Sequence, residues 1–339
     1  MWWLFILYAV LLVGVVYLSN TVAKCTDYIE KHTKLTGALL GGIVLAGITS
    51  LPELVTGITS SLLGEPSLVQ GDIFGSNIFD ICILGVIMIV FGRTVKQANV
   101  SKDNARLVLW SGLICACIIV VGLIEIFCNV SFVIPYVNIN VLAIVCIAVY
   151  ILALATTQKV DEDIKSDVQS EIDNQNVDVS VNKAELKSVV TKFVVSALLL
   201  IGVSIAITFI SNIISDEFGL GKGLVGAIFL GVATSLPEII SSFTLVKLGN
   251  YNSAYGNIIG SCFFNFLVLG IADMFFFGGT VFMANLQSVY ATLCILMGLG
   301  ALYLSYFLKA RTKHCNQTTL TLCGLTTLVC YVVCLFVLA

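Results

Sequence analysis

Long apolar runs separated by short polar connections recur along the whole chain. Each run holds about 20 residues or more, which is enough to cross roughly 30 Å of hydrocarbon as an α-helix. The pattern predicts an all-α integral membrane protein with ten transmembrane helices. The predicted spans are approximately residues 2–20, 38–63, 67–91, 105–127, 132–156, 189–213, 221–247, 253–277, 285–308 and 318–338.

Composition supports this pattern. Of 339 residues, 58% are hydrophobic and 11% are charged, whereas soluble domains have about 25% charged residues. The lipid bilayer is therefore the expected surroundings. The net charge of −3 comes without a basic stripe, so nucleic acid is not an expected partner. The twelve cysteines lie mostly inside apolar runs and form no CxxC pair, which favours a role as small apolar residues.

The basic residues are distributed unevenly between the two sides of the predicted bundle. If the N-terminus is outside, 16 Lys and Arg fall on the inner side and only Lys222 on the outer side. This split follows the positive-inside rule, and a missed span would scramble it. We therefore expect both termini outside, in a cell membrane. The first span lacks a charged leader and a cleavage site, so we expect it to be retained.

One long polar stretch, residues 157–188, divides the ten spans into five and five. It is expected to be a solvated cytoplasmic linker. Its DEDIKSDVQSEI segment has Lys165, Ser166 and Ile172 where an EF-hand loop needs an oxygen ligand, Gly and Glu. Weak regulatory cation binding there stays an alternative.

The two halves contain an internal repeat. Residues 45–85 align without a gap to residues 230–270 at a constant offset of 185, with 16 of 41 positions identical. Five spans, an odd number, separate the copies, so they cross the membrane in opposite directions. This predicts two inverted five-helix repeats, residues 1–156 and 189–339, an architecture typical of secondary transporters with a substrate site where the copies meet.

Glu53, Asp80 and Glu238 are carboxylic acids that fall near the middle of predicted spans. A buried acid costs about 2.5–3.5 kcal/mol on insertion scales, so each needs a partner. No Lys or Arg lies at a similar depth in the four spans of the internal repeat, 38–63, 67–91, 221–247 and 253–277. The remaining possibilities are protonation and a cation taken from solution.

Hydroxyl residues surround these acids at helical spacing. Two prolines, Pro52 and Pro237, also free main-chain carbonyls one turn earlier, at Ile48 and Ala233. Hard oxygen ligands suit calcium, whereas zinc or copper prefers His and Cys ligands, and these helices hold no His while Cys262 stands alone beside the acids. The hydroxyl residues are Thr49, Ser50, Ser60, Ser76, Thr234, Ser235, Ser242 and Ser261.

The segments GITSLPELVTGITSSLLGEP and GDIFGSNIFD, with GVATSLPEIISS and GNIIGSCFFN in the second copy, resemble the alpha repeats of the cation/calcium exchanger superfamily, especially its sodium/calcium exchanger branch. The resemblance implies a central calcium site formed by Glu53, Asp80, Glu238 and Asn265. It further implies sodium sites formed by the carbonyls of Thr49 and Thr234 and by Ser50, Ser76, Ser235, Ser261, Ala46 and Gly231.

The chain departs from the family pattern at several positions. Asp80 lies in the first repeat and Asn265 in the second, whereas some members have the reverse order. Cys262 replaces an Asn, and Asp72 replaces the Asn of a GN pair. Asp72 is expected either to add charge to an outer vestibule or to face water.

These features predict a secondary active antiporter that exchanges sodium for calcium by alternating access. It is expected to need no cofactor and to perform no enzymatic reaction. A monomer is sufficient for this function, and the sequence leaves the oligomeric state open. Two alternatives remain: a proton/calcium antiporter of the same fold, in which the acids take up protons, and a passive cation channel.

Overall fold

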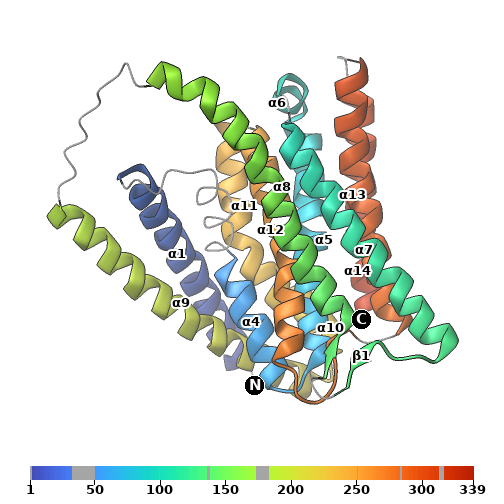
Figure 1. The fold of residues 1–339 in the computed structure, drawn as a ribbon. Helices are drawn as coiled ribbons and strands as arrows, with labels where there is room; N and C mark the ends of the chain where they lie inside the picture. Colours follow the sequence, from blue (N-terminus) through green and yellow to red (C-terminus); the bar gives the residue numbers. More distant parts are fainter. Residues whose placement is uncertain are drawn as a thin grey trace.

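The computed structural model describes residues 2–32, 50–98, 100–135, 138–172, 183–249, 251–282, 285–312 and 317–339, and helices make up most of this part (Figure 1). The first half contains α1 (Trp3–His32), α4 (Leu51–Leu62), α5 (Pro66–Val90), α6 (Gly92–Gln97), α7 (Lys102–Cys128) and α8 (Val141–Ile172). The second half contains α9 (Lys183–Phe218), α10 (Lys222–Val225), the π-helix η1 (Gly226–Gly231), α11 (Val232–Lys247), α12 (Tyr251–Met274), α13 (Leu286–Thr312) and α14 (Gln317–Leu338).

The helices agree with the predicted spans. Within the described residues, 8 helices are long and apolar enough to cross a membrane, and Val141–Thr156 is a shorter apolar helix. The second predicted span is represented by α4, and its residues 38–49 lie outside the described part. The protein is thus a multi-pass, mainly α-helical membrane protein.

Two boundaries differ from the prediction. The span predicted from residue 132 begins as a short antiparallel pair, β1 (Val133–Ile134) with β2 (Ile139–Asn140), and α8 starts only at Val141. Its β-branched residues fit a strand as well as a helix. At the other end, α8 continues to Ile172 and α9 begins at Lys183, so both helices extend into the predicted polar linker.

The bundle has a buried centre and an apolar outer face. Among the long apolar helices of the described part, α5 and α12 are the most enclosed, whereas most of α1 is exposed on the outer face. In Figure 1, α1 and α9 lie together on one side of the molecule, and they pack on α4 and α11. Large apolar side chains such as Trp3, Val10 and Phe336 point outward, as expected for a surface that contacts lipid.

The chain termini lie at the same end of the bundle. Figure 1 shows the N- and C-termini at the lower end, together with the β1–β2 pair, whereas α6 lies at the upper end. The termini on one side agree with an even number of crossings.

A polar network ties the connections together at the end that holds the termini. The Asp273 carboxylate, at the end of α12, accepts hydrogen bonds from the Thr280 hydroxyl (2.7 Å), the Val281 amide (2.7 Å) and the Asn140 amide (2.8 Å). The Gln70 amide group donates to the Val281 carbonyl at 2.7 Å. These bonds join α5, α12, β2 and the segment after α12.

Replacing Asp273 with Ala is expected to destabilise the fold by about 3 kcal/mol, because two buried main-chain amides lose their acceptor. The measurement is thermal unfolding of the full-length protein in detergent. The control is Asp103→Ala, whose exposed carboxylate pairs with Arg106 at 3.1 Å and should change stability by less than about 0.5 kcal/mol. Equal unfolding temperatures for the two variants would contradict the structural role of Asp273.

Candidate functional site

The four predicted central residues are all fully buried. Glu53 is on α4, Asp80 on α5, Glu238 on α11 and Asn265 on α12, and each has 0% of its surface exposed. Glu53 lies within direct electrostatic range of both Glu238 and Asp80. The fold therefore gathers acids from both halves of the chain in one interior region.

Hydroxyl groups bridge the two halves around these acids. The Ser50 hydroxyl donates to a Glu238 carboxylate oxygen at 3.3 Å and lies 3.0 Å from the Ser261 hydroxyl. The Ser76 hydroxyl lies 3.4 Å from that of Thr234. Each contact joins a residue of the first repeat to one of the second, as expected if the two motifs form a single site.

The π-helix η1 supplies a main-chain oxygen to this region. The Gly231 carbonyl, at the end of η1, accepts hydrogen bonds from the hydroxyls of Ser76 (3.2 Å) and Thr234 (3.4 Å). π-turns inside α-helices are frequent at functional sites. The sequence predicted an interrupted helix here from Pro237, but Pro237 lies inside the continuous helix α11 and the irregular turn comes before it.

In the first repeat, Pro52 lies in the first turn of α4, directly after Ser50 and Leu51. The predicted sodium ligands Ala46 and Thr49, and the carbonyl of Ile48, lie outside the described residues. The remaining predicted ligands are buried in the interior: Ser50, Ser76, Gly231, Thr234, Ser235 and Ser261.

Asn77 is not among the predicted ligands, yet it contacts Asn265 and Cys262 beside the central acids. The Asn265 amide nitrogen donates to the Asn77 side-chain oxygen at 3.0 Å. Cys262, at the position equivalent to Asn77, directs its thiol at the Asn77 carbonyl (3.7 Å) and at Asp80 (3.9 Å). Because the amide nitrogen of Asn265 is engaged, its oxygen is the atom left for another partner.

A second pair of contacts repeats at the offset of 185 residues. The Thr56 hydroxyl donates to the Glu53 carbonyl (3.1 Å) and to the Asp72 carboxylate (2.5 Å). At the equivalent positions, the Ser241 hydroxyl donates to the Glu238 carbonyl at 2.9 Å and accepts from Asn257 at 3.0 Å. The hydroxyl residue and its partner are 16 residues apart in both halves, and this shared spacing is the signal in the sequence that points to the two contacts.

Asp72 is fully buried. The expectation that it faces water is therefore wrong. The other expectation, that Asp72 adds charge to an outer vestibule, stays a prediction.

Within the described ranges, the region contains several buried acceptor oxygens without partners, beside the unpartnered amide nitrogen of Asn77 and the hydroxyl of Ser235. Among the described residues, no hydrogen-bond partner is found for either carboxylate oxygen of Glu53, for one oxygen of Asp80 or for the side-chain oxygen of Asn265. Buried polar atoms are almost always paired, so such a group of acceptors indicates a place for a positive charge. The ion pairs in the described part lie at helix ends, where Lys222 contacts Glu65 and Asp216, and Arg106 contacts Asp103.

The ligand chemistry is mixed. Within the described part of the chain, no three His, Cys, Asp or Glu side chains converge as a metal site by themselves. Any cation bound here would need hydroxyl, amide and carbonyl oxygens as well as the acids. Calcium and sodium accept such oxygen sets, whereas zinc and copper prefer nitrogen and sulfur.

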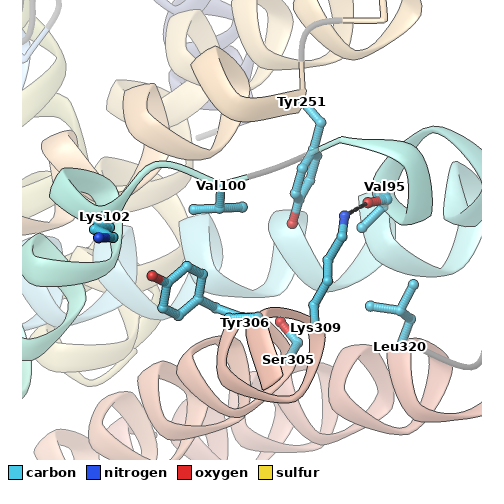
Figure 2. Close-up of a pocket in the computed structure, with 9 residues that line it drawn as sticks. Val95, Val100, Lys102, Tyr251, Ser305, Tyr306, Lys309 and Leu320 are labelled. Atoms are coloured by element: carbon cyan, nitrogen blue, oxygen red, sulfur yellow. Dashed lines mark hydrogen bonds between the residues drawn. The ribbon is translucent and has the colours of Figure 1, made fainter. Parts of the chain in front are cut away.

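A separate cavity of about 220 Å³ contains none of these residues. Figure 2 shows its lining, in which the Lys309 ammonium points toward the Val95 carbonyl. Lys309 donates to that carbonyl at 2.6 Å and also to the carbonyl of Ala98. This lysine thus holds the end of α6, and the cavity is distinct from the buried acids. Its lining is Val95, Val100, Lys102, Tyr251, Ser305, Tyr306, Lys309, Ala310 and Leu320.

Comparison with known proteins places the fold. The inner membrane protein YrbG of Escherichia coli (strain K12) is 24% identical to the chain over 274 residues, which are 78% of each protein. A structure of the sodium-calcium exchanger NCX_Mj superposes with a TM-score of 0.58 and 21% identity, covering 98% of both chains. The structure of native YfkE gives a TM-score of 0.65 at 15% identity, covering 98% of this chain and 91% of that one. At these identities the two structures establish a shared fold.

A family model described as the sodium/calcium exchanger protein matches residues 3–158 and 188–339. The two matched segments include the two predicted five-helix repeats and leave out most of the polar stretch between them. Since the match spans nearly the entire sequence, the chain belongs to the sodium/calcium exchanger protein family.

Proposed function

We propose that this protein is a secondary active antiporter that exchanges sodium for calcium by alternating access. The observation that carries the proposal is the buried group of acceptor oxygens on α4, α5, α11 and α12, which draws on both halves and includes no basic side chain among the described residues. A cation/calcium antiporter is also what membership of the family supports.

In this proposal calcium binds between Glu53, Glu238, Asp80 and Asn265. Sodium ions bind to the surrounding hydroxyls and carbonyls: Ala46, Thr49, Ser50, Ser76, Gly231, Thr234, Ser235 and Ser261. The contact of Ser50 with Glu238 supports a single shared site, because a proposed sodium ligand touches a carboxylate that would hold calcium. The contact of Ser76 with the Gly231 carbonyl joins proposed sodium ligands of the two halves. Sodium and calcium would then compete for the shared site.

Competition couples the two fluxes. Several buried acids without a counter-ion are costly in a low-dielectric interior. The empty, fully ionised site therefore resists the conformational change between the outward-open and inward-open states. Either one calcium or several sodium ions lowers that cost. The chain itself supplies both halves of the site, so a monomer is sufficient and no cofactor or enzymatic step is involved.

We further propose ten spans arranged as two inverted five-helix repeats, residues 1–156 and 189–339. The distribution of charge supports an orientation. In Figure 1, α6, which carries Arg93 and Lys96, lies at the end opposite the termini, whereas α10, which carries Lys222, lies at the end with them. The positive-inside rule then puts α6 and the connection between α8 and α9 in the cytoplasm and both termini outside a cell membrane.

The test is calcium uptake into proteoliposomes that contain the purified full-length protein. Uptake is expected to be driven by an outward sodium gradient, and to stay at the level of empty liposomes under a pH gradient alone or with no gradient. Calcium uptake that follows the pH gradient and ignores sodium would establish the proton-coupled alternative, which the buried acids also permit. Calcium uptake in the absence of both a sodium gradient and a pH gradient would establish a passive channel.

A further inference from the structure

Asp72 lies outside the proposed central set but is buried beside it. It is on α5, about two helical turns before Asp80, with 0% of its surface exposed. One carboxylate oxygen accepts the Thr56 hydroxyl at 2.5 Å. The other oxygen has no hydrogen-bond partner among the described residues.

The local supply of hydrogen-bond donors is too small for the acceptors. The single hydroxyl hydrogen of Thr56 faces both the Asp72 carboxylate and the Glu53 carbonyl. The nearby Tyr8 phenol, which is in electrostatic range of Asp72, donates its hydrogen to the Phe229 carbonyl at 2.7 Å. Among the described residues, the shared hydroxyl hydrogen of Thr56 is the one side-chain donor found for the Asp72 carboxylate, and its second oxygen has none, so a buried carboxylate in that position lacks compensation.

The equivalent position in the second half has the opposite balance. Asn257 replaces the carboxylate with an amide, which donates to the Ser241 and Ser242 hydroxyls at 3.0 Å and to the Glu238 carbonyl at 3.3 Å. In the second half, the amide hydrogens of Asn257 therefore satisfy the acceptors in an arrangement that otherwise matches that of the first half. The first half has an acid in its place and is short of positive charge.

Basic side chains do not supply that charge in the described part of the chain. Lys222, which is near the start of α5, is engaged by Asp216, Glu65 and Asn212. The oxygen types present, a carboxylate, a hydroxyl and a main-chain carbonyl, are those that bind alkali and alkaline-earth ions in proteins. A singly charged ion matches the single carboxylate.

We propose that Asp72 and Thr56 hold one additional sodium ion in the first half of the protein, outside the central site, and that the second half has no counterpart. The choice of sodium rests on the proposed exchange of sodium for calcium. In the orientation given above, Asp72 is nearer the outer end of its helix than Asp80 is. On the inner side, the equivalent position at the matching depth is occupied by the neutral Asn257. The additional ion therefore makes sodium binding from the outside and from the inside unequal.

The test is a count of sodium ions bound at equilibrium by the purified full-length protein in detergent, with ²²Na as the probe. Asp72→Asn, which gives the first half the residue of the second, is expected to bind one sodium ion fewer per chain than the wild type. Asp103→Asn, an exposed acid on α7, is the matched control and is expected to bind the wild-type number.

A second variant tests the same site in case Asp72→Asn does not fold. Thr56→Val keeps the shape of the side chain but removes the hydroxyl, and it is expected to lose the same sodium ion or to bind it at least about tenfold more weakly, the effect of roughly 1.4 kcal/mol. Size-exclusion profiles decide which variants are folded. A wild-type count with wild-type affinity in the folded variants would overturn the proposal.

The result is separable from the proposed function. Loss of a sodium ion in Asp72→Asn, together with calcium uptake that ignores sodium in the wild type, would leave this site standing and remove the exchange mechanism. Sodium-driven calcium uptake in the wild type, together with an unchanged sodium count in Asp72→Asn, would remove this site alone.

Discussion

Replacing Glu53 or Glu238 with Gln is expected to lower sodium-driven calcium uptake by about 100-fold or more. Gln keeps the shape of the side chain but removes the charge, and losing one charged partner of a buried divalent ion costs about 3 kcal/mol or more. Glu53 is expected to show the larger effect, because neither of its carboxylate oxygens has a hydrogen-bond partner among the described residues. Its charge is therefore free to meet an ion.

The same variants are expected to fold. A neutral amide is cheaper to bury than a carboxylate, so the unfolding temperature in detergent should stay equal or rise. Glu217→Gln on the exposed end of α9 is the matched control and should transport like the wild type. Full uptake in both Glu53→Gln and Glu238→Gln would show that calcium does not bind at these acids, and the assignment of the central site would have to be abandoned.

The sequence predicts the spans and the buried acids well because lipid is a demanding solvent. An acid such as Glu53 inside an apolar run has few structural explanations, and the recurrence of its motif around Glu238 removes most of them. The structure confirms that both acids are buried, and the match to the family confirms the resemblance. Their roles as calcium ligands stay a prediction.

Other features depend on three-dimensional packing and could not be predicted. The residues of the π-helix η1, GAIFLG, are compatible with an ordinary helix in the sequence, and only the structure shows that Gly226 and Gly231 lie closely against α5. The burial of Asp72 was undecided because α5 is enclosed on nearly every side, so no polar face of the helix points to water. The hairpin before Val141 was missed because its apolar residues suit a strand and a span equally.

The contact between α5 and the π-helix is the feature of the fold on which the site depends most. A Cβ atom at Gly75 would lie 2.3 Å from the Ala227 Cα and 2.7 Å from the Ala227 Cβ, and one at Gly71 would lie 2.2 Å from the Gly223 carbonyl oxygen. Small residues let helix backbones meet this closely in membrane proteins. The next residue after Gly75 is Ser76, whose hydroxyl contacts the Gly231 carbonyl.

Replacing Gly75 with Ala is therefore expected to push α5 away from η1, to destabilise the protein by about 3 kcal/mol or more, and to abolish exchange. The atoms in the way are the Cα, Cβ and carbonyl oxygen of Ala227, and no side-chain rotation moves them, so the clash is not relieved locally. Gly300→Ala is the matched control, since a Cβ there meets nothing within 4 Å, and helix propensity should make it neutral or more stable by up to about 1 kcal/mol. Thermal unfolding in detergent and sodium-driven calcium uptake are the measurements.

A double variant tests whether the clash itself is the cause. Ala227→Gly in the Gly75→Ala background removes the contact at 2.7 Å but leaves the contact with the Ala227 Cα at 2.3 Å. Partial recovery of stability is expected, with a coupling energy between the two positions of about 0.5–3 kcal/mol. If Gly75→Ala were as stable and active as Gly300→Ala, the two helices would have room to separate without disturbing Ser76 and Gly231. The site would then not depend on the fixed distance between α5 and η1.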